Sequence, residues 1–357
     1  MTVITGGLWV NMVNWGINKI SENEPREMSN NISEKIGITT TIPVELVFAA
    51  QKTPVDLNNI FITSPLRMDA IAAAELDGYP RTVCGWIKGL YGMVAKYRVV
   101  DKMVAVTEGD CSQTHALMET LGEKGVEIIP FSFPFDRDRQ LLLRQLEKLA
   151  FSLQTTLSCA DEQYRRLREV RETVWEIDRL TWEENRVSGA ENHYYQVSCS
   201  DFEGNPERFA AKVSEFVREA KQRKPFEDKL RLGFIGVPPI FDDLYQFIEE
   251  RGAQVVFNEV QRQFSLPHAS GSLLEDYLAY TYPYHVQYRI EDILEQISLR
   301  KIDALVHYTQ SFCFRQIEDI CFRKKLPVPI LTIEAESPGP LDARTQLRLE
   351  TFLSMLK

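Results

Sequence analysis

The feature that most constrains the fold is the alternation of short apolar runs with segments of helical periodicity. The predicted strands are 36–41, 59–63, 102–106, 126–131, 230–237, 253–257, 304–308 and 329–333. The predicted helices between and after them are 44–50, 84–97, 112–121, 241–251, 290–299, 314–325 and 345–356. Such runs are typical of parallel sheets that helices cover on both faces. We therefore expect an α/β fold with two doubly wound, Rossmann- or flavodoxin-like, parallel-sheet domains.

A change in pattern near the middle of the chain indicates how these domains are joined. Leucines at 142, 146, 149 and 153 form one helical stripe, and a highly charged stretch of helical spacing follows. We predict an N-terminal helical lead at 1–35, a first α/β domain at 36–135, a helical connector at 136–228 and a second α/β domain at 229–357. The connector is expected to contain a polar break near 188–201.

The charge and the apolar content exclude several classes of function. A net charge of −10 and a pI near 5.2 argue against nucleic-acid binding, which needs clustered Lys and Arg. No apolar run approaches the roughly 18 residues of a membrane span. The first basic residue is Lys19, which does not fit a secretory signal. We therefore expect a cytoplasmic protein that binds neither nucleic acid nor membrane, with its six cysteines reduced.

Three of the cysteines share a local context. Cys111 and Cys313 each follow a predicted strand and precede a helix, and Cys84 precedes a helix after a turn. In doubly wound sheets such junctions lie where ligands bind, and free helix N–H groups there stabilise thiolates. The three thiolates can therefore converge on one cationic cluster. The remaining cysteines are expected in packing roles, with Cys321 as a reserve ligand.

Two other interpretations of these cysteines remain open. Each one taken alone fits a small buried apolar side chain. Alternatively, Cys111 can act as a nucleophile with His115, which lies one helical turn further along. No C-x-x-C spacing occurs, so zinc ribbons and ferredoxin-type motifs are absent.

Six separated blocks of the sequence carry a family resemblance. They are "IPVELVFAAQKTPVDL" (42–57), "CGWIKGLYG" (84–92), "GDCSQTHALMETL" (109–121), "GVPPIFDDLYQFIEERGAQVVFNEVQRQF" (236–264), "VHYTQSFCFRQIEDI" (306–320) and "ILTIEAESPGPLDARTQLRLETFL" (330–353). In this order they resemble the 2-hydroxyacyl-CoA dehydratase component D family, which includes benzoyl-CoA reductase subunits and double-cubane cluster proteins. The resemblance spans about 36–356.

The resemblance implies an iron–sulfur cofactor and a reaction type. Its three cysteine ligands map onto Cys84, Cys111 and Cys313, leaving one iron of a [4Fe-4S] cluster with an exchangeable site. An ATP-dependent activator protein supplies a low-potential electron in this family, and in the dehydratases the acyl-CoA becomes a ketyl radical that loses its hydroxyl. The expected function is an oxygen-sensitive dehydration or reduction of an acyl-CoA or other small molecule.

The resemblance also leaves alternatives for cofactor, assembly and catalysis. Family enzymes pair two such subunits, identical or related, so a dimer is expected. A double-cubane reductase with a sulfide-bridged [8Fe-9S] cluster is one alternative, and a non-catalytic electron-transfer partner is another. Glu45, in the "IPVE" turn, matches the place where relatives carry a carboxylate near the substrate and is the candidate acid or base. Its other interpretation is a carboxylate stabilised by the helix N-terminus.

Overall fold

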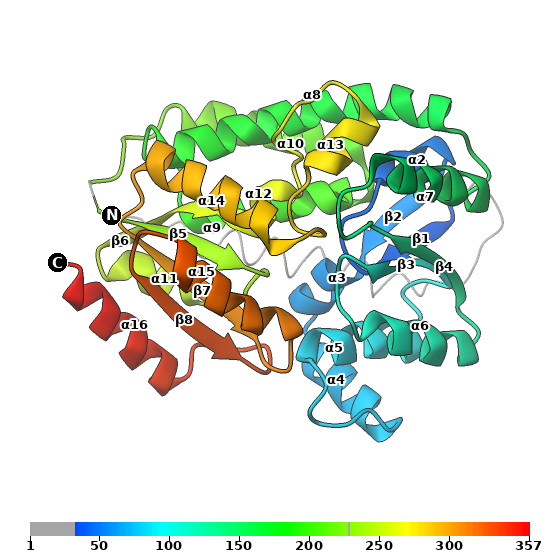
Figure 1. Ribbon diagram of the computed structural model, residues 1–357, viewed down its shortest axis with the longest axis horizontal. Coiled ribbons are helices and arrows are strands. Elements are labelled where there is room, and N and C mark those ends of the chain that lie inside the picture. The colour runs from blue at the N-terminus through cyan, green and yellow to red at the C-terminus, as the bar shows by residue number, and fades with distance from the viewer. Residues whose placement is uncertain (1–32, 228) are drawn as a thin grey trace.

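Two four-stranded parallel sheets lie side by side in the computed structural model, which describes residues 33–357 except 228 (Figure 1). The first sheet contains β1 (Lys35–Ile38), β2 (Thr53–Asp56), β3 (Lys102–Glu108) and β4 (Glu127–Ser132), in the order β2-β1-β3-β4. The second contains β5 (Leu230–Gly236), β6 (Ala253–Asn258), β7 (Ala304–Gln310) and β8 (Ile330–Ala335), in the order β6-β5-β7-β8. The two orders are the same when each half is counted from its own first strand, and the α/β prediction is confirmed. Nearly all of the predicted N-terminal lead lies outside the described residues.

One predicted strand is wrong. Residues 59–63 belong to the helix α3 (Leu57–Thr63), and the strand that precedes it is β2, whose last residue Asp56 accepts a hydrogen bond from the Asn58 N–H at 2.9 Å. An aspartate in this position caps a helix. Pro54 argues against a strand in the sequence, because proline cannot donate a backbone hydrogen bond. However, β2 is an edge strand, where proline is tolerated.

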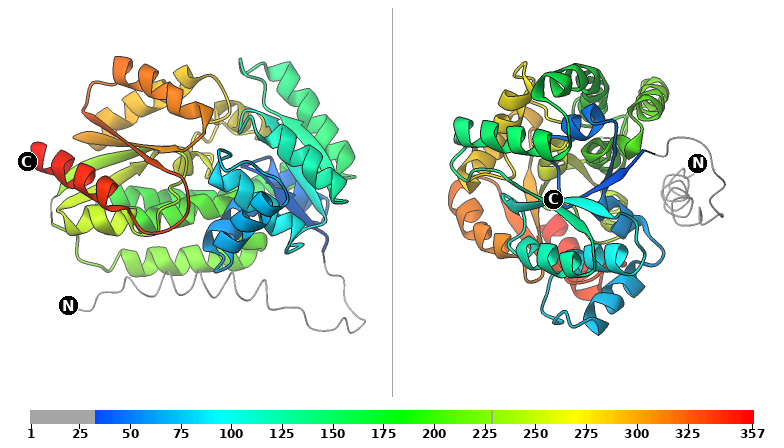
Figure 2. Two further views of the ribbon diagram at one scale, coloured as in Figure 1. Left: turned by 90° about the horizontal axis from the view of Figure 1, so that it is seen from below. Right: turned by 90° about the vertical axis from the view of Figure 1, so that its right-hand side faces the viewer.

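Helices cover both faces of the first sheet. Alternate residues of β3 point to opposite sides, so that Val104 and Val106 join one core and Met103 and Ala105 another. The first core packs against α2 (Val44–Ala49) and α7 (Arg139–Ser152); the second packs against α3, α4 (Arg67–Leu76), α5 (Gly85–Ala95) and α6 (Thr114–Glu123). Figure 2, right, shows these two groups above and below the strands.

The region between the sheets is helical, as predicted. It comprises α7, α8 (Leu157–Trp182), α9 (Gly189–Val197), the short η1 (Ser198–Ser200) and η2 (Phe202–Gly204), and α10 (Pro206–Ala220). The predicted break at 188–201 is mostly α9, which a reciprocal pair of hydrogen bonds between Ser188 and Glu191 caps. The long α8 runs along the top of the molecule and contacts α2 of the first half and β6 of the second (Figure 1).

The second sheet is covered in the same way. One face packs against α11 (Leu244–Glu250) and α16 (Ala343–Met355), and the other against α14 (Val286–Arg300) and α15 (Asp319–Lys325). The remaining short helices are α12 (Glu259–Gln263), α13 (Leu273–Ala279) and η3 (Phe314–Glu318). Among the described residues, no helix combines the length and the apolar character needed to cross a membrane.

Candidate functional site

A cavity of about 800 Å³ lies between the two halves. Its lining includes residues that follow the carboxyl ends of β1 and β3 in the first half and of β5 and β7 in the second. In each sheet these strands are neighbours at the point where the chain order reverses, which is the usual ligand-binding position in doubly wound folds. Cys84, Cys111 and Cys313 all line this cavity.

Cys84 is held at the start of α5, where it occupies the N-cap position. Its side chain is almost completely buried, and burial raises the pKa of the thiol to about 11 although backbone N–H groups of Ile87 and Trp86 oppose the shift. The Cys84 N–H donates to the side-chain oxygen of Gln113 at 3.4 Å. This bond connects the Cys84 loop to the loop that carries Cys111.

Cys111 lies in the loop between β3 and α6, two residues before the N-cap Gln113, whose N–H donates to the Cys111 sulfur at 3.4 Å. Gly109 allows this loop to turn, because its φ is +97° and a Cβ there would lie 2.8 Å from Pro283. Burial and the neighbouring Asp110 raise the pKa of the Cys111 thiol. The loop thus presents its sulfur to the cavity from the tip of β3.

Cys313 occupies the equivalent position in the second half, after β7, and is the N-cap of η3. Burial raises the pKa of this thiol, while Arg315 opposes the shift. Arg315 also donates to the Gly109 carbonyl at 3.1 Å, so it ties the Cys313 loop to the Cys111 loop of the other half. The three cysteine loops therefore meet at one cavity, and the binding of a cationic cluster by their thiolates stays a prediction.

The chemistry of these thiols fits a polynuclear metal cofactor. They are free, and Cys84 and Cys313 each raise the pKa of Cys111. Buried thiols that destabilise one another's charge are stabilised as thiolates by bound cations. Among the described residues, no three His, Cys, Asp or Glu side chains form a site for a single metal ion. A cluster differs in this respect, since each cysteine binds a different iron and the sulfurs stay apart.

Two charged residues at this site were not predicted from the sequence. Asp110 lines the cavity; burial raises its pKa to about 6, Arg315 opposes the shift, and the Tyr282 hydroxyl donates to it at 3.2 Å. The Arg315 guanidinium stacks over the Tyr282 ring at 4.3 Å and donates to Glu318 at 3.1 Å. The sequence held one indication of both residues, their closeness to the candidate cysteines: Asp110 adjoins Cys111, and Arg315 lies two residues after Cys313.

Glu45 is not among the residues that line the cavity. It is fully buried, accepts a hydrogen bond from Arg171 at 2.6 Å and another from the Tyr277 hydroxyl at 3.0 Å. This ion pair joins α2 to α8 and α13. Its catalytic role stays a prediction, whereas its structural contacts are clear.

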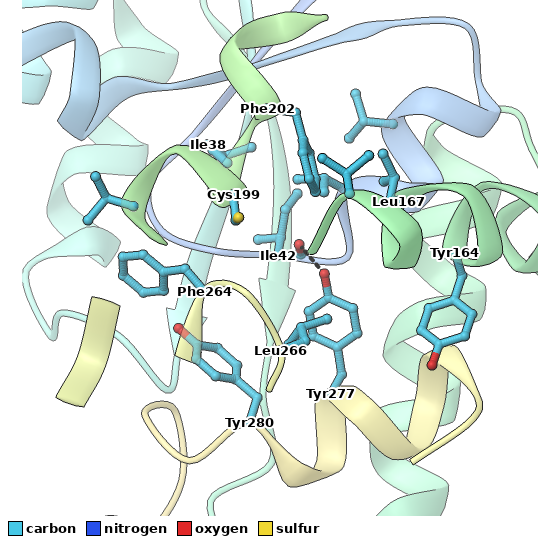
Figure 3. Close-up of a cluster of buried hydrophobic side chains, with 14 of the residues drawn as sticks. Ile38, Ile42, Tyr164, Leu167, Cys199, Phe202, Phe264, Leu266, Tyr277 and Tyr280 are labelled. Atoms are coloured by element: carbon cyan, nitrogen blue, oxygen red, sulfur yellow. Dashed lines mark hydrogen bonds between the residues drawn. The ribbon is translucent and has the colours of Figure 1, made fainter. Parts of the chain in front are cut away.

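The other cysteines also lie outside the cavity lining. Cys321 packs with the core under α14 and α15, and Cys159 is exposed on α8. Cys199 is buried in the first core, which also contains Phe202, Phe264 and Tyr280 (Figure 3). His115 is exposed, and its Nε2 contacts the Thr107 carbonyl at 3.0 Å rather than the Cys111 sulfur.

The fold and this cavity define a two-sheet α/β protein with three cysteines on separate loops at the junction of its halves. The chain belongs to the family of the 2-hydroxyglutaryl-CoA dehydratase D-component, whose family model matches residues 39–356, nearly the whole chain. This match confirms the resemblance that the six sequence blocks indicated. A search of curated proteins gave no significant match.

Proposed function

We propose that this protein is an oxygen-sensitive iron–sulfur enzyme of the 2-hydroxyacyl-CoA dehydratase type, with its cluster bound by Cys84, Cys111 and Cys313. The observation that carries the proposal is that these three thiols, far apart in the sequence, line one cavity at the tips of two sheets. Family membership supports a dehydratase-type component. When bound, such a cluster supplies a one-electron carrier with one iron free of protein ligands.

The surrounding side chains suit this role. The Arg315 guanidinium, which is buried at the cavity wall, offsets the negative charge of three thiolates. Its bond to Gly109 and its stacking on Tyr282 fix its position. Cys84 itself is almost fully buried, so its sulfur is shielded from bulk water, which suits chemistry on a reactive species.

The number of cavity cysteines favours a single cubane per chain. A sulfide-linked double cubane needs about six thiolates, and here Cys159, Cys199 and Cys321 lie outside the cavity lining. Cys321 accordingly remains only a reserve ligand. We further propose that an ATP-dependent activator delivers the electron, that the chain pairs with an identical or related subunit in the cytoplasm, and that an acyl-CoA or similar small molecule is dehydrated or reduced.

Anaerobic purification followed by iron and sulfide analysis and EPR spectroscopy tests the proposal. About four irons per chain and a reducible cluster are expected. Cys84→Ala, Cys111→Ala and Cys313→Ala should each remove or convert the cluster, whereas Cys159→Ala and Cys321→Ala should leave it intact. A colourless protein without iron after anaerobic reconstitution would exclude the proposal.

The structure gives less support to a thiol nucleophile at Cys111. The nearest candidate base, His115, contacts a backbone carbonyl instead, and the pKa of the thiol is raised rather than lowered. Alkylation of Cys111 in an iron-free protein with loss of a hydrolytic activity would restore that alternative.

A further inference from the structure

Another side of the same cavity is formed by α9 and α11 rather than by the cysteine loops. His193 of α9 and Tyr245 and Glu249 of α11 line it together with apolar side chains that include Val197, Phe226 and Phe241. The Glu191–Arg223 ion pair also lines this side, so the hydrogen-bonding state of its polar groups determines what can bind there.

A chain of hydrogen bonds fixes the histidine. The Asn258 side-chain N–H donates to the Gly189 carbonyl at 3.2 Å, which leaves the Asn258 side-chain oxygen as an acceptor. The Tyr245 hydroxyl donates to that oxygen at 2.8 Å, and its own oxygen lies 3.1 Å from Nδ1 of His193. Because a tyrosine hydroxyl has only one proton, His193 must donate from Nδ1 to Tyr245.

The other ring nitrogen of His193 is then an acceptor. A neutral imidazole that carries its proton on Nδ1 has a lone pair on Nε2, and no described residue makes a hydrogen bond to Nε2. Burial lowers the pKa of His193 to about 4 and raises the pKa of Tyr245 well above its usual value, so both stay neutral near pH 7. The cavity lining therefore includes a fixed hydrogen-bond acceptor next to apolar side chains.

We infer that this side of the cavity binds an uncharged ligand group with a hydroxyl or amide N–H, which donates to Nε2 of His193. An anion is disfavoured, because it would face this lone pair beside the carboxyl groups of Glu249 and Glu250, while Arg223 is already paired with Glu191 at 2.9 Å. Among ligand groups of one shape, the site favours the donor, since an unpaired buried acceptor costs free energy. Only one step rests on the proposed function, namely that this ligand is the substrate.

The tautomer is testable in the full-length chain without iron. In ¹⁵N-histidine NMR spectra we expect His193 to be a neutral Nδ1–H form that is unchanged between pH 6 and 8. His307 is a second histidine that donates from Nδ1, because this atom lies 2.7 Å from a carboxylate oxygen of Asp319. Tyr245→Phe should give a mixture of tautomers at His193, and His193→Phe should delete its signals. Tyr79→Phe, which removes a hydroxyl bonded to Thr120, is the matched control and should change nothing. An Nε2–H form of His193 in the wild type would overturn the inference.

Binding of three six-carbon probes tests the selectivity. The wild type should bind 1-hexanol about five- to tenfold more tightly than 1-methoxypentane, and hexanoate more weakly than 1-hexanol. In His193→Phe the alcohol and the ether should bind equally. In Tyr245→Phe the preference should shrink, because the imidazole can then present an N–H to the ether. Equal binding of alcohol and ether by the wild type, or an unchanged preference in His193→Phe, would overturn the inference. Neither readout needs iron, so a failure of cluster assembly is a separate result that counts against the proposed function alone.

Discussion

At the scale of single residues, a substitution at Glu45 can distinguish a structural role of this side chain from a catalytic one. Glu45 is fully buried against Arg171 and Tyr277. Replacing it by Gln leaves a buried guanidinium without its counter-charge, a change that typically costs about 3–5 kcal/mol. We therefore expect Glu45→Gln to lower the free energy of unfolding, measured in urea, by an amount in this range.

The matched control is Glu172→Gln. Glu172 also pairs with an arginine of α8, Arg168, at 3.0 Å, but at the surface. Its loss should change the free energy of unfolding by less than about 0.5 kcal/mol. If Glu45→Gln instead keeps full stability and loses turnover, Glu45 is catalytic and its ion pair is incidental.

Glu249 should make the free energy of unfolding depend on pH, also at the scale of a single residue. Burial raises its pKa to about 7, above the unfolded value of about 4.5, so the native state binds more protons than the unfolded state between these pH values. The stability that the neutral carboxyl contributes is complete below pH 4.5 and is lost as the pH rises through about 7. Relative to Glu249→Gln, the wild type should lose on the order of 2 kcal/mol between pH 5 and pH 8 in urea unfolding. A constant difference between the two proteins would show that Glu249 is ordinarily solvated.

At the scale of helices and strands, the sequence was most informative where periodicity was undisturbed. The strands β3, β4, β5 and β7 were predicted close to their observed bounds, because each is a buried run between clear helices. The errors have local causes. Pro54 made the edge strand β2 hard to recognise, so the strand was assigned to the apolar residues of α3 instead. The polar sequence of α9 likewise gave no sign of a helix, which its capping pair stabilises.

The helix that carries Cys84 depends on two glycines. A Cβ at Gly92 of α5 would lie 2.0 Å from the Ala70 carbonyl oxygen of α4, and one at Gly89 would meet the Phe61 ring at 2.3 Å. Gly92→Ala must therefore push α5 away from α4. We expect it to destabilise the protein by about 1–3 kcal/mol or more in urea unfolding and to reduce iron bound per folded chain.

The same substitution has the opposite expectation at Gly122, near the end of α6. No atom lies within 4 Å of a Cβ built there, and its φ is not in the left-handed region. Gly122→Ala should stabilise the protein by up to about 1 kcal/mol through helix propensity. If both variants behave alike, the close approach of α5 to α4 is not what limits substitution at Gly92.

At the scale of the whole molecule, only part of the candidate site could be predicted from the sequence. Cys84, Cys111 and Cys313 were singled out because each precedes a predicted helix, after a strand for Cys111 and Cys313 and after a turn for Cys84. The contact between Arg315 and the Gly109 carbonyl spans 206 positions, and no local pattern encodes it. The same holds for the burial of Glu45, since Arg171 and Tyr277 come from distant segments.

The two halves are also joined by Arg67 and Asp242, and this pair should control access to the cavity. Arg67 donates to both oxygens of Asp242, at 2.8 and 2.5 Å, and Asp242 lines the cavity. Because both side chains are partly exposed, the pair should contribute about 1 kcal/mol. Arg67→Ala should therefore raise the population of an open form, and with it the rate at which a thiol reagent modifies Cys84 in the iron-free protein, by about fivefold.

Arg251→Ala is the control that distinguishes opening from general destabilisation. Arg251 pairs with Glu350 at 2.8 Å with comparable exposure, but both residues belong to the second half. Its loss should leave the rate of Cys84 modification unchanged while costing similar stability. Equal acceleration in both variants would mean that Cys84 becomes accessible through overall unfolding. Acceleration in Arg67→Ala alone would mean that the halves separate as units, because the cavity is built from residues of both.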